Sequence, residues 1–479
     1  MHLAAAAIFL TAFGWLLYCA VPTLYWGDSA EMTSVACSVG VAHSPGYPLF
    51  SVLSRIFLWL PMQTPFAAHL MSVFFASAAL AILFYTLCAM TGQIFAPAVG
   101  ASLFAGIPAF VSFSLYIEVY ALHLFLFCAL IYCLTQIENN RDERWFMAAL
   151  LVLAAGVSHH ILMYFALAAF MIYCMLRPGH AHRTTTVPLL LFFAWSFMNL
   201  LNAHELAVDT IKWFKIGIYT AAGIYAAYLV LIGFFARKKF PAVSAATIAG
   251  LFIFAAGVGI FIYLPLTSAR GPVADWWSPD TPGGFLNLLF LKGYPPTFPD
   301  TYIEAQKRAD LAGLIAYMLI PVMCAAAVGL LAMLFRKVRA RIALMLLFTG
   351  VFTLVGAMLV KHGKPEALRL PVYLIIDIFA AYSLAWVLSW RLWRGKKWKA
   401  ALAAPIYILT VLYVMIPIQR ADFRVMNKSG SAYELGENII DETAPGSILF
   451  IGEQTPSIIG YFSACEPARL KKKHIVPVP

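Results

Sequence analysis

The chain has 479 residues, of which 62% are hydrophobic and only 11% are charged. A soluble domain carries about a quarter charged residues, so this composition excludes a string of soluble domains. The mean hydropathy is +0.82, and apolar runs of membrane-spanning length recur along the chain. Together these features indicate an all-α polytopic membrane protein.

About thirteen transmembrane helices are expected. The first, residues 3–24, is predicted to be retained, because no basic segment precedes it and no small-residue cleavage site follows it. A very tight turn at Ser158–His160 has to separate two short spans. The other spans are predicted at 66–90, 97–114, 120–136, 145–160, 161–176, 187–201, 216–236, 241–264, 312–335, 342–360, 371–389 and 400–418.

The basic residues set the expected orientation. About half of the 33 lysines and arginines lie in the short loops 138–144, 177–183, 237–239, 336–341 and 391–399. The positive-inside rule places these loops and the N-terminus in the cytoplasm, and the C-terminal segment outside. The net charge of +11 is therefore an orientation signal, and no nucleic-acid partner is predicted. We expect a multi-pass integral membrane protein, in the inner membrane if the cell is bacterial.

Two domains are predicted. Residues 1–418 form the transmembrane domain, with long outer loops at 25–65 and 265–311. The first loop is expected to hold two interfacial helices, at about 28–39 and 49–60. Residues 419–479 read as a small extracytoplasmic α/β tail, with helices at 432–441 and 455–463 and a strand at 447–451. This tail is too short to bury a core of its own, so it should pack on the outer face of the bundle.

The chain has eight cysteines. Most lie inside apolar runs and read as small buried hydrophobic residues. Cys37 and Cys465 lie in polar-side segments, and we do not expect a bridge between them. No Cys/His spacing typical of a metal site is present.

The most informative stretch is the first outer loop. Asp28 and Glu31 have the spacing of a capping box, in which Asp28 is the N-cap and Glu31 reaches back to its amide. A carboxylate held rigidly at a helix N-terminus also suits a general base or a metal ligand. The two interpretations do not exclude each other, and Asp28 is a possible ligand of a divalent metal. No other cofactor is predicted.

Other outer-face groups are candidates for the same site. Glu118, at the outer end of the third span, either faces Asp28 or is a solvated interfacial carboxylate. His123 is expected to be a packed core histidine. His159 and His160 are weak evidence for a functional site, because neighbours on a helix point to different faces.

Cations on the same face could stabilise a phosphate leaving group. Arg369 is the first choice, followed by Arg270 and Lys361, and interfacial anchoring is the alternative for each. Trp276 and Trp277 could stack on a sugar ring or belong to an interfacial aromatic belt. Asp377 lies inside a span, where a hydrogen bond between helices would explain it.

The first loop also carries a recognisable pattern. Gly27–Glu31 (Gly-Asp-Ser-Ala-Glu) is followed by Ala42–Leu49 (Ala-His-Ser-Pro-Gly-Tyr-Pro-Leu). This pair resembles the signature of a bacterial membrane family related to a vertebrate transmembrane protein O-mannosyltransferase. The usual form has Gly for Ala30 and Pro for Ser44. Supporting stretches are Ile117–Leu122, Tyr263–Arg270 with Asp275–Pro279, and Arg369–Tyr373. Arg270 follows Pro265 at a greater distance than the arginine usual in the family.

That family is similar to the GT-C glycosyltransferases, and the resemblance implies their fold and chemistry. It implies a sugar donor on polyprenyl phosphate at the outer face, an inverting displacement, and an acidic first-loop residue, here Asp28, as base or metal ligand. His43 and Tyr47, within the signature, would bind substrate. The acceptor is a hydroxyl of a protein, lipid or glycan.

Two other functions remain open. A transporter or lipid flippase would need several ionisable groups at mid-membrane depth, where Asp377 is the chief example. A family member that only binds lipid or scaffolds a partner is the third possibility.

Overall fold

The computed structural model describes residues 1–140, 142–177, 180–203, 220, 241–290, 320–359, 365–389, 405, 430–450 and 456–478. The predicted spans 216–236 and 400–418 lie outside these residues, apart from the isolated positions 220 and 405.

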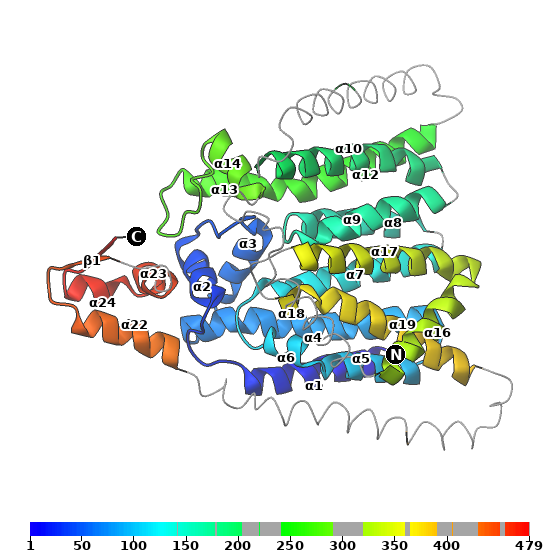
Figure 1. Cartoon of the computed structure of the whole chain (residues 1–479), viewed down its shortest axis with the longest axis horizontal. Coiled ribbons are helices and arrows are strands. Elements are labelled where there is room, and N and C mark those ends of the chain that lie inside the picture. Colours follow the sequence, from blue (N-terminus) through cyan, green and yellow to red (C-terminus); the bar gives the residue numbers. More distant parts are fainter. Residues whose placement is uncertain are drawn as a thin grey trace, which may run out of the picture.

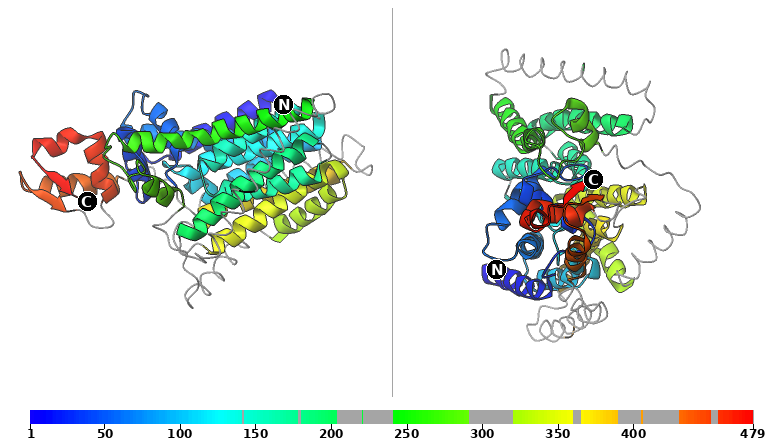
Figure 2. Two further views of the ribbon diagram at one scale, coloured as in Figure 1. Left: turned by 90° about the horizontal axis from the view of Figure 1, so that it is seen from above. Right: turned by 90° about the vertical axis from the view of Figure 1, so that its left-hand side faces the viewer.

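Long apolar helices lie side by side in one bundle, as Figures 1 and 2 show. They are α1 (His2–Cys19), α4 (Thr64–Thr91), α5 (Phe95–Ala105), α7 (Val119–Asn140), α8 (Glu143–Val157), α9 (Leu162–Leu176), α10 (His180–Ala203), α12 (Pro241–Val258), α16 (Ile320–Leu334), α17 (Lys337–Leu359) and α19 (Leu370–Leu388). Within the described ranges, six helices are long and apolar enough to cross a membrane. The protein is therefore an integral, multi-pass membrane protein.

The bundle also contains helices too short to cross the bilayer alone. The predicted span 97–114 is wrong as a single helix, because α5 ends at Ala105 and a separate α6 (Pro108–Ser112) follows. Pro108 has no backbone N–H and disfavours helical geometry at Ile107, so the helix breaks there. The predicted break at Ser158–His160 is confirmed, since α8 ends at Val157 and α9 begins at Leu162.

A polar cluster closes one end of the bundle. Arg341 of α17 pairs with Glu138 at the end of α7, and the Tyr173 hydroxyl donates to the same carboxylate over 2.8 Å. Two loops predicted to share a face, 138–144 and 336–341, thus meet at one end. The membrane side on which this end lies stays a prediction.

The short helices and the tail gather at the opposite end (Figure 1). The two helices predicted in the first loop are confirmed as α2 (Asp28–Ser38) and α3 (Pro48–Phe57). Four more short elements follow α12 or precede α19. They are η1 (Gly259–Ile262) continuing into α13 (Tyr263–Ser268), α14 (Pro282–Leu289) and α18 (Pro365–Leu368).

The tail is a small α/β unit that shares its core with the first loop. It contains α22 (Ser431–Glu442), β1 (Ile448–Phe450), α23 (Pro456–Cys465), α24 (Pro467–Lys472) and β2 (Val476–Val478). The first three lie where the sequence predicts helix, strand and helix, whereas α24 and β2 were not predicted. β1 and β2 pair in parallel. Leu24 and Ala30 are buried in one cluster with Tyr461 and Phe462 of α23.

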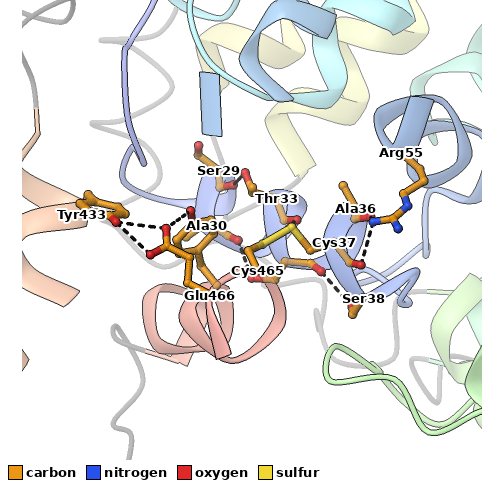
Figure 3. Close-up of a disulfide and its surroundings, with 12 residues drawn as sticks. Ser29, Ala30, Thr33, Ala36, Cys37, Ser38, Arg55, Tyr433, Cys465 and Glu466 are labelled. Carbon is orange, nitrogen blue, oxygen red and sulfur yellow. Dashed lines mark hydrogen bonds between the residues drawn. A yellow bond between two sulfur atoms is a disulfide. The ribbon is translucent and has the colours of Figure 1, made fainter. Parts of the chain in front are cut away.

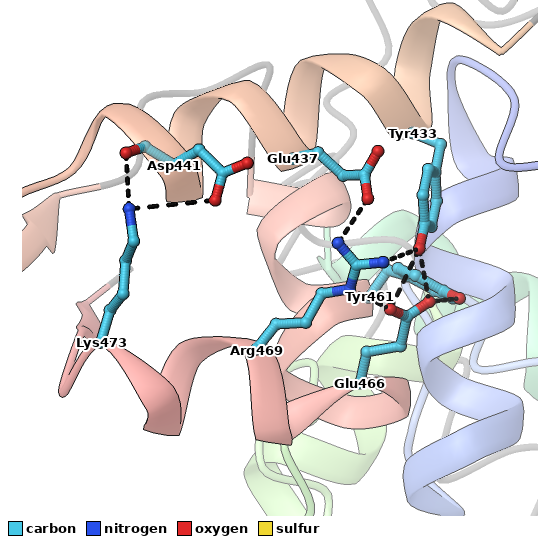
Figure 4. A network of polar contacts seen from close by, with 7 residues as sticks. All are labelled: Tyr433, Glu437, Asp441, Tyr461, Glu466, Arg469 and Lys473. Carbon is cyan, nitrogen blue, oxygen red and sulfur yellow. Dashed lines mark hydrogen bonds and ion pairs between the residues drawn. The ribbon is translucent and has the colours of Figure 1, made fainter.

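Partly exposed ion pairs and hydrogen bonds tie the tail elements together, as Figure 4 shows. The Glu466 carboxylate accepts hydrogen bonds from Tyr433 and from Tyr461, the latter over 2.6 Å. Arg469 pairs with Glu466 over 2.7 Å and also with Glu437. The network joins α22, α23 and α24, so a segment with little hydrophobic core of its own holds one shape.

A disulfide fixes the tail to the first loop. Cys37 of α2 and Cys465 of α23 are bonded, with Cα atoms 5.4 Å apart and a sequence separation of 428, as Figure 3 shows. The expectation that these cysteines are not bridged was therefore wrong. It failed because α23 packs along α2, a tertiary contact that has no local sequence signal.

This disulfide predicts which cysteines of the purified chain are bonded to each other. Peptides containing Cys37 and Cys465 should be recovered as one cross-linked species from a digest without reductant, and as two after reduction. Replacing both cysteines by serine should destabilise docking of the tail by about 2–4 kcal/mol and lower the midpoint of thermal unfolding. The buried Cys128 and Cys174 are internal controls that should stay unmodified in the folded protein. Free, alkylatable thiols at both positions in unreduced protein would contradict the assignment.

Candidate active site

Helix α2 presents different faces to three neighbours. Asp28 and Glu31, one turn apart, lie on one side. Ala30 and Cys37 face the tail. Ser29 faces α4, where its hydroxyl lies 3.2 Å from Nε2 of His69. A short polar helix is thus held rigidly against a membrane bundle, and its two carboxylates take fixed positions.

The far end of α2 is held by a cation. Arg55 of α3 donates to the carbonyl oxygens of Ala36 and Cys37 over 3.1 and 2.9 Å. A positive charge here satisfies carbonyls that have no partner within the helix and complements the helix dipole.

Glu31 does not cap the helix. Gly27 is the N-cap residue, no side-chain cap bond forms, and Asp28 is the first helical residue. The Glu31 carboxylate instead accepts the backbone N–H of His43 over 2.7 Å and Nδ1–H of the same residue over 3.0 Å. The capping-box interpretation of Glu31 was therefore wrong, because the tight turn at residues 43–47 returns His43 to the same carboxylate.

This pair leaves His43 positively charged at neutral pH. Burial by itself would lower the pKa of His43, but the charge and hydrogen bond of Glu31, with smaller effects of Asp28 and Glu118, raise it to about 9. The imidazole and carboxylate are both largely buried, with about a tenth of each side chain exposed. The site therefore contains a fixed cation among three carboxylates.

Two hydrogen bonds that involve backbone groups hold Glu118 near Asp28. The Val21 N–H donates to the Leu115 carbonyl over 3.0 Å, which joins the segment before α2 to the segment before α7. Ser72 of α4 accepts the Glu118 N–H over 3.1 Å. Burial and then Glu118, with a smaller effect of Asp28, raise the pKa of Tyr116. Asp28, Glu118 and His43 are therefore electrostatic neighbours.

The second outer loop reaches the same place. Val41 N–H donates to the Ala274 carbonyl over 2.8 Å, and Trp276 N–H donates to the Val41 carbonyl. Only glycine fits at position 40, because a Cβ there would lie 2.4 Å from the Ala274 oxygen. This pairing places the Trp276 ring edge-on to His43, with centroids 6.2 Å apart.

Tyr47 also belongs to the site. Its ring lies 5.2 Å from that of His43 and 5.9 Å from that of His160, to which it is nearly parallel. Trp277 lies on the same turn as Trp276, with a positive φ of 62°, and its side chain is exposed. The structure therefore brings His43, Tyr47 and Trp276 together, and both tryptophans are exposed.

The predicted phosphate ligands differ in their burial and in their location in the fold. Arg369 is 5% exposed and precedes α19, next to α18, which contacts α6. Arg270 is exposed, and its charge acts on Tyr263, whose hydroxyl donates to the Gly40 carbonyl at the far end of α2. Lys361 lies outside the described residues.

Two supporting residues were missed at the sequence level. His69 donates from Nδ1 to the Val21 carbonyl over 2.8 Å, and its other nitrogen meets Ser29. Ser72 holds the backbone of Glu118. A histidine inside the apolar run 66–90 was the available signal, because an ionisable residue within a span usually has a specific partner.

The described residues contain no group of three or more His, Cys, Asp and Glu side chains arranged to share a metal ion. A metal-binding role for Asp28 therefore stays a prediction.

The fold defines the class of protein. Crystal structures of ArnT from Cupriavidus metallidurans, in the apo state and bound to undecaprenyl phosphate, match with TM-scores of 0.55 and 0.53. Each comparison covers 99% of this chain and 88% of ArnT, at 10% sequence identity. At this identity the likeness establishes the fold alone, which is the GT-C fold that the sequence predicts.

The sequence comparisons find a family that is similar to the N-terminal part of the chain. Residues 28–184 match the protein O-mannosyl-transferase TMEM260 N-terminal domain. Protein O-mannosyl-transferase TMEM260 of Mus musculus is 31% identical over 147 residues, which are 29% of this chain and 21% of the mouse protein. The N-terminal part of the chain is thus similar to the N-terminal domain of the TMEM260 proteins. It matches about a fifth of the length of its curated mouse relative.

The Glu31–His43 pair predicts a pH-dependent stability. A pKa raised from 6.5 to about 9 means that the pair stabilises the fold fully below pH 6.5, and that this stabilisation is lost as the pH rises through about 9. A Glu31→Gln variant should be less stable than wild type by roughly 3 kcal/mol at about pH 6, a gap that should shrink towards pH 10. Thermal unfolding in detergent between these values measures it.

His43→Gln serves as the matched control for this pair. It should remove the same pH-dependent part, and combining it with Glu31→Gln should add little further loss. If the unfolding temperatures of wild type and Glu31→Gln changed in parallel with pH, Glu31 would not be the group that raises the pKa of His43.

Proposed function

We propose that the protein is a membrane glycosyltransferase that transfers a sugar from polyprenyl phosphate to an acceptor hydroxyl on the extracytoplasmic face, with inversion. The observation that carries the proposal is the cluster of Asp28, Glu118 and cationic His43, held at one end of a GT-C bundle. The matched family segment begins at Asp28 and contains all three residues. The solved neighbour bound to undecaprenyl phosphate supports a lipid phosphate as the carrier.

Asp28 is the proposed base. It is partly exposed at the first turn of α2, whereas Glu31 is occupied by His43 and Glu118 is 1% exposed. The acceptor hydroxyl gives its proton to Asp28 as its oxygen attacks the anomeric carbon. The bond from that carbon to the phosphate oxygen breaks, and its electron pair leaves with the lipid phosphate.

The cations stabilise the charge that develops on the phosphate. Arg369 is buried beside the outer segments, so it acts in a medium where a charge is screened less than in water. His43 adds a second positive charge next to Asp28. Arg270 lies towards the other end of α2 and is the weaker candidate. Glu31 acts as a positioning residue through His43.

The cluster favours surface chemistry over a transport path. In the described part of the chain the carboxylates and the cation meet at the outer end of the bundle, around α2. Asp377, which the transporter alternative would use, is buried within α19. Release of free undecaprenyl phosphate from a labelled undecaprenyl-phosphate sugar distinguishes the two functions, because a flippase leaves the bond to the sugar intact.

Replacing the base should abolish transfer without unfolding the protein. Asp28→Asn keeps the size of the side chain and removes its basic oxygen, so turnover should fall by roughly 10²–10⁴-fold. Binding of undecaprenyl phosphate should change little. Turnover is measured as the release of labelled carrier from the purified full chain in nanodiscs.

Asp280→Asn is the matched control, because Asp280 is an exposed aspartate on the second outer loop. This variant should keep wild-type turnover. Full activity of Asp28→Asn would remove Asp28 from the chemistry. A wild-type chain that moves the lipid and never releases free carrier would favour the flippase.

A further inference from the structure

Three histidines lie together beneath the first loop, outside the set of groups used above. His123 is on the second turn of α7, and His159 and His160 form the turn between α8 and α9. Ring centroids are 5.3 Å apart for His123 and His160 and 6.1 Å apart for His159 and His160. We call these three residues the histidine wall.

The wall is adjacent to the candidate active site. The Tyr47 ring contacts both His159 and His160, at 6.3 and 5.9 Å, and Tyr47 also touches His43. On α7 the wall begins one turn after Glu118. Tyr120, between the two, packs on His160 at 5.6 Å.

The hydrogen bonds within the wall leave specific atoms unsatisfied. His159 donates Nε2–H to the Val119 carbonyl over 2.9 Å, which leaves Nδ1 as an acceptor. His160 accepts the Leu162 N–H at Nδ1 over 3.2 Å. Among the described residues, neither nitrogen of His123 and not Nδ1 of His159 has a hydrogen-bond partner. All three side chains are at most 3% exposed.

Buried polar atoms in folded proteins are almost always paired, so these unpaired atoms indicate a missing partner. A neutral imidazole offers one donor and one acceptor. His123 therefore presents both kinds of group and His159 adds an acceptor. Hydroxyl groups match this mixture because each can donate and accept. A phosphate, which only accepts, matches it poorly.

The aromatic surroundings fit the same kind of ligand. Binding sites for small molecules combine apolar and aromatic surface with a few placed polar groups. Tyr47 and Tyr120 supply the rings, and the wall supplies the polar atoms. We propose that His123 and His159, with His160 and Tyr47 beside them, bind the hydroxyl groups of the sugar on the lipid carrier. This inference rests on the proposed function and assigns the sugar subsite within it.

The arrangement divides the donor between two sets of residues. The sugar lies against the histidine wall, within the outer part of the bundle. The phosphate lies towards His43 and Arg369. This separation predicts that sugar recognition and phosphate recognition can be weakened independently, although the two groups are bonded to each other.

The test measures the affinity of the purified full chain in nanodiscs for undecaprenyl phosphate, undecaprenyl-phosphate mannose and undecaprenyl-phosphate glucose. Wild type should bind at least one sugar-bearing lipid more tightly than the bare phosphate. His123→Leu should weaken that lipid about tenfold and leave undecaprenyl phosphate within about twofold. His123→Asn, which keeps a donor and an acceptor, should retain part of the preference. Arg369→Gln should weaken all three lipids.

Each other result has a defined meaning. If wild type binds none of the lipids, the proposed function fails and the inference with it. If His123→Leu weakens all three lipids equally, or none, or if wild type does not favour a sugar-bearing lipid, the inference fails and the proposed function stands.

A second measurement applies if His123→Leu does not fold. A structure of the wild-type chain with the preferred sugar-bearing lipid should place a sugar hydroxyl within hydrogen-bond distance of His123. A sugar bound elsewhere would overturn the assignment.

Discussion

The site depends on the way in which α2 is held. This helix carries two acidic residues at the end of an apolar bundle, where an unpaired buried charge would be costly. Glu31 is paired with His43, the last carbonyls accept from Arg55, and Ser29 meets His69. These contacts fix the orientation of the helix. Asp28 lies at its partly exposed first turn. The contacts of its other polar groups therefore hold α2, and with it Asp28, in a fixed position.

Much of this arrangement could be predicted from local sequence patterns. The rest depends on contacts between residues that are distant in the sequence. The two helices of the first loop were predictable, because apolar sequence gives way there to a polar segment with Gly and Pro on either side of a turn. The capping box at Asp28 and Glu31 failed because a local pattern cannot show that His43, twelve residues on, competes for the same carboxylate. Pro108 is a helix breaker that the sequence shows, but the apolar run around it led to the prediction of one continuous span. The unsatisfied atoms of His123 depend on packing and have no sequence signature.

The tail and the second outer loop both pack on the first loop, and they contact different sides of it. The loop after α13 adds Trp276 beside His43 through backbone pairing at Val41. The tail covers the opposite side of α2 through Ala30 and the bond from Cys37. A disulfide persists in an oxidising compartment, which agrees with the orientation expected from the basic loops and rests on a different physical property. The side of α2 that carries Ala30 and Cys37 thus packs on the tail, and its other neighbours belong to the membrane bundle.

The bond between Cys37 and Cys465 also has a consequence for biogenesis. Its partners are separated by 428 residues, and the ribosome makes the first long before the second. During that interval the side of α2 that carries Ala30 and Cys37 has no tail to cover it, although the spans around it are already being inserted. Covalent closure of the first loop therefore comes late in assembly. The order of synthesis delays the rigid form of the first loop until the rest of the bundle has been made.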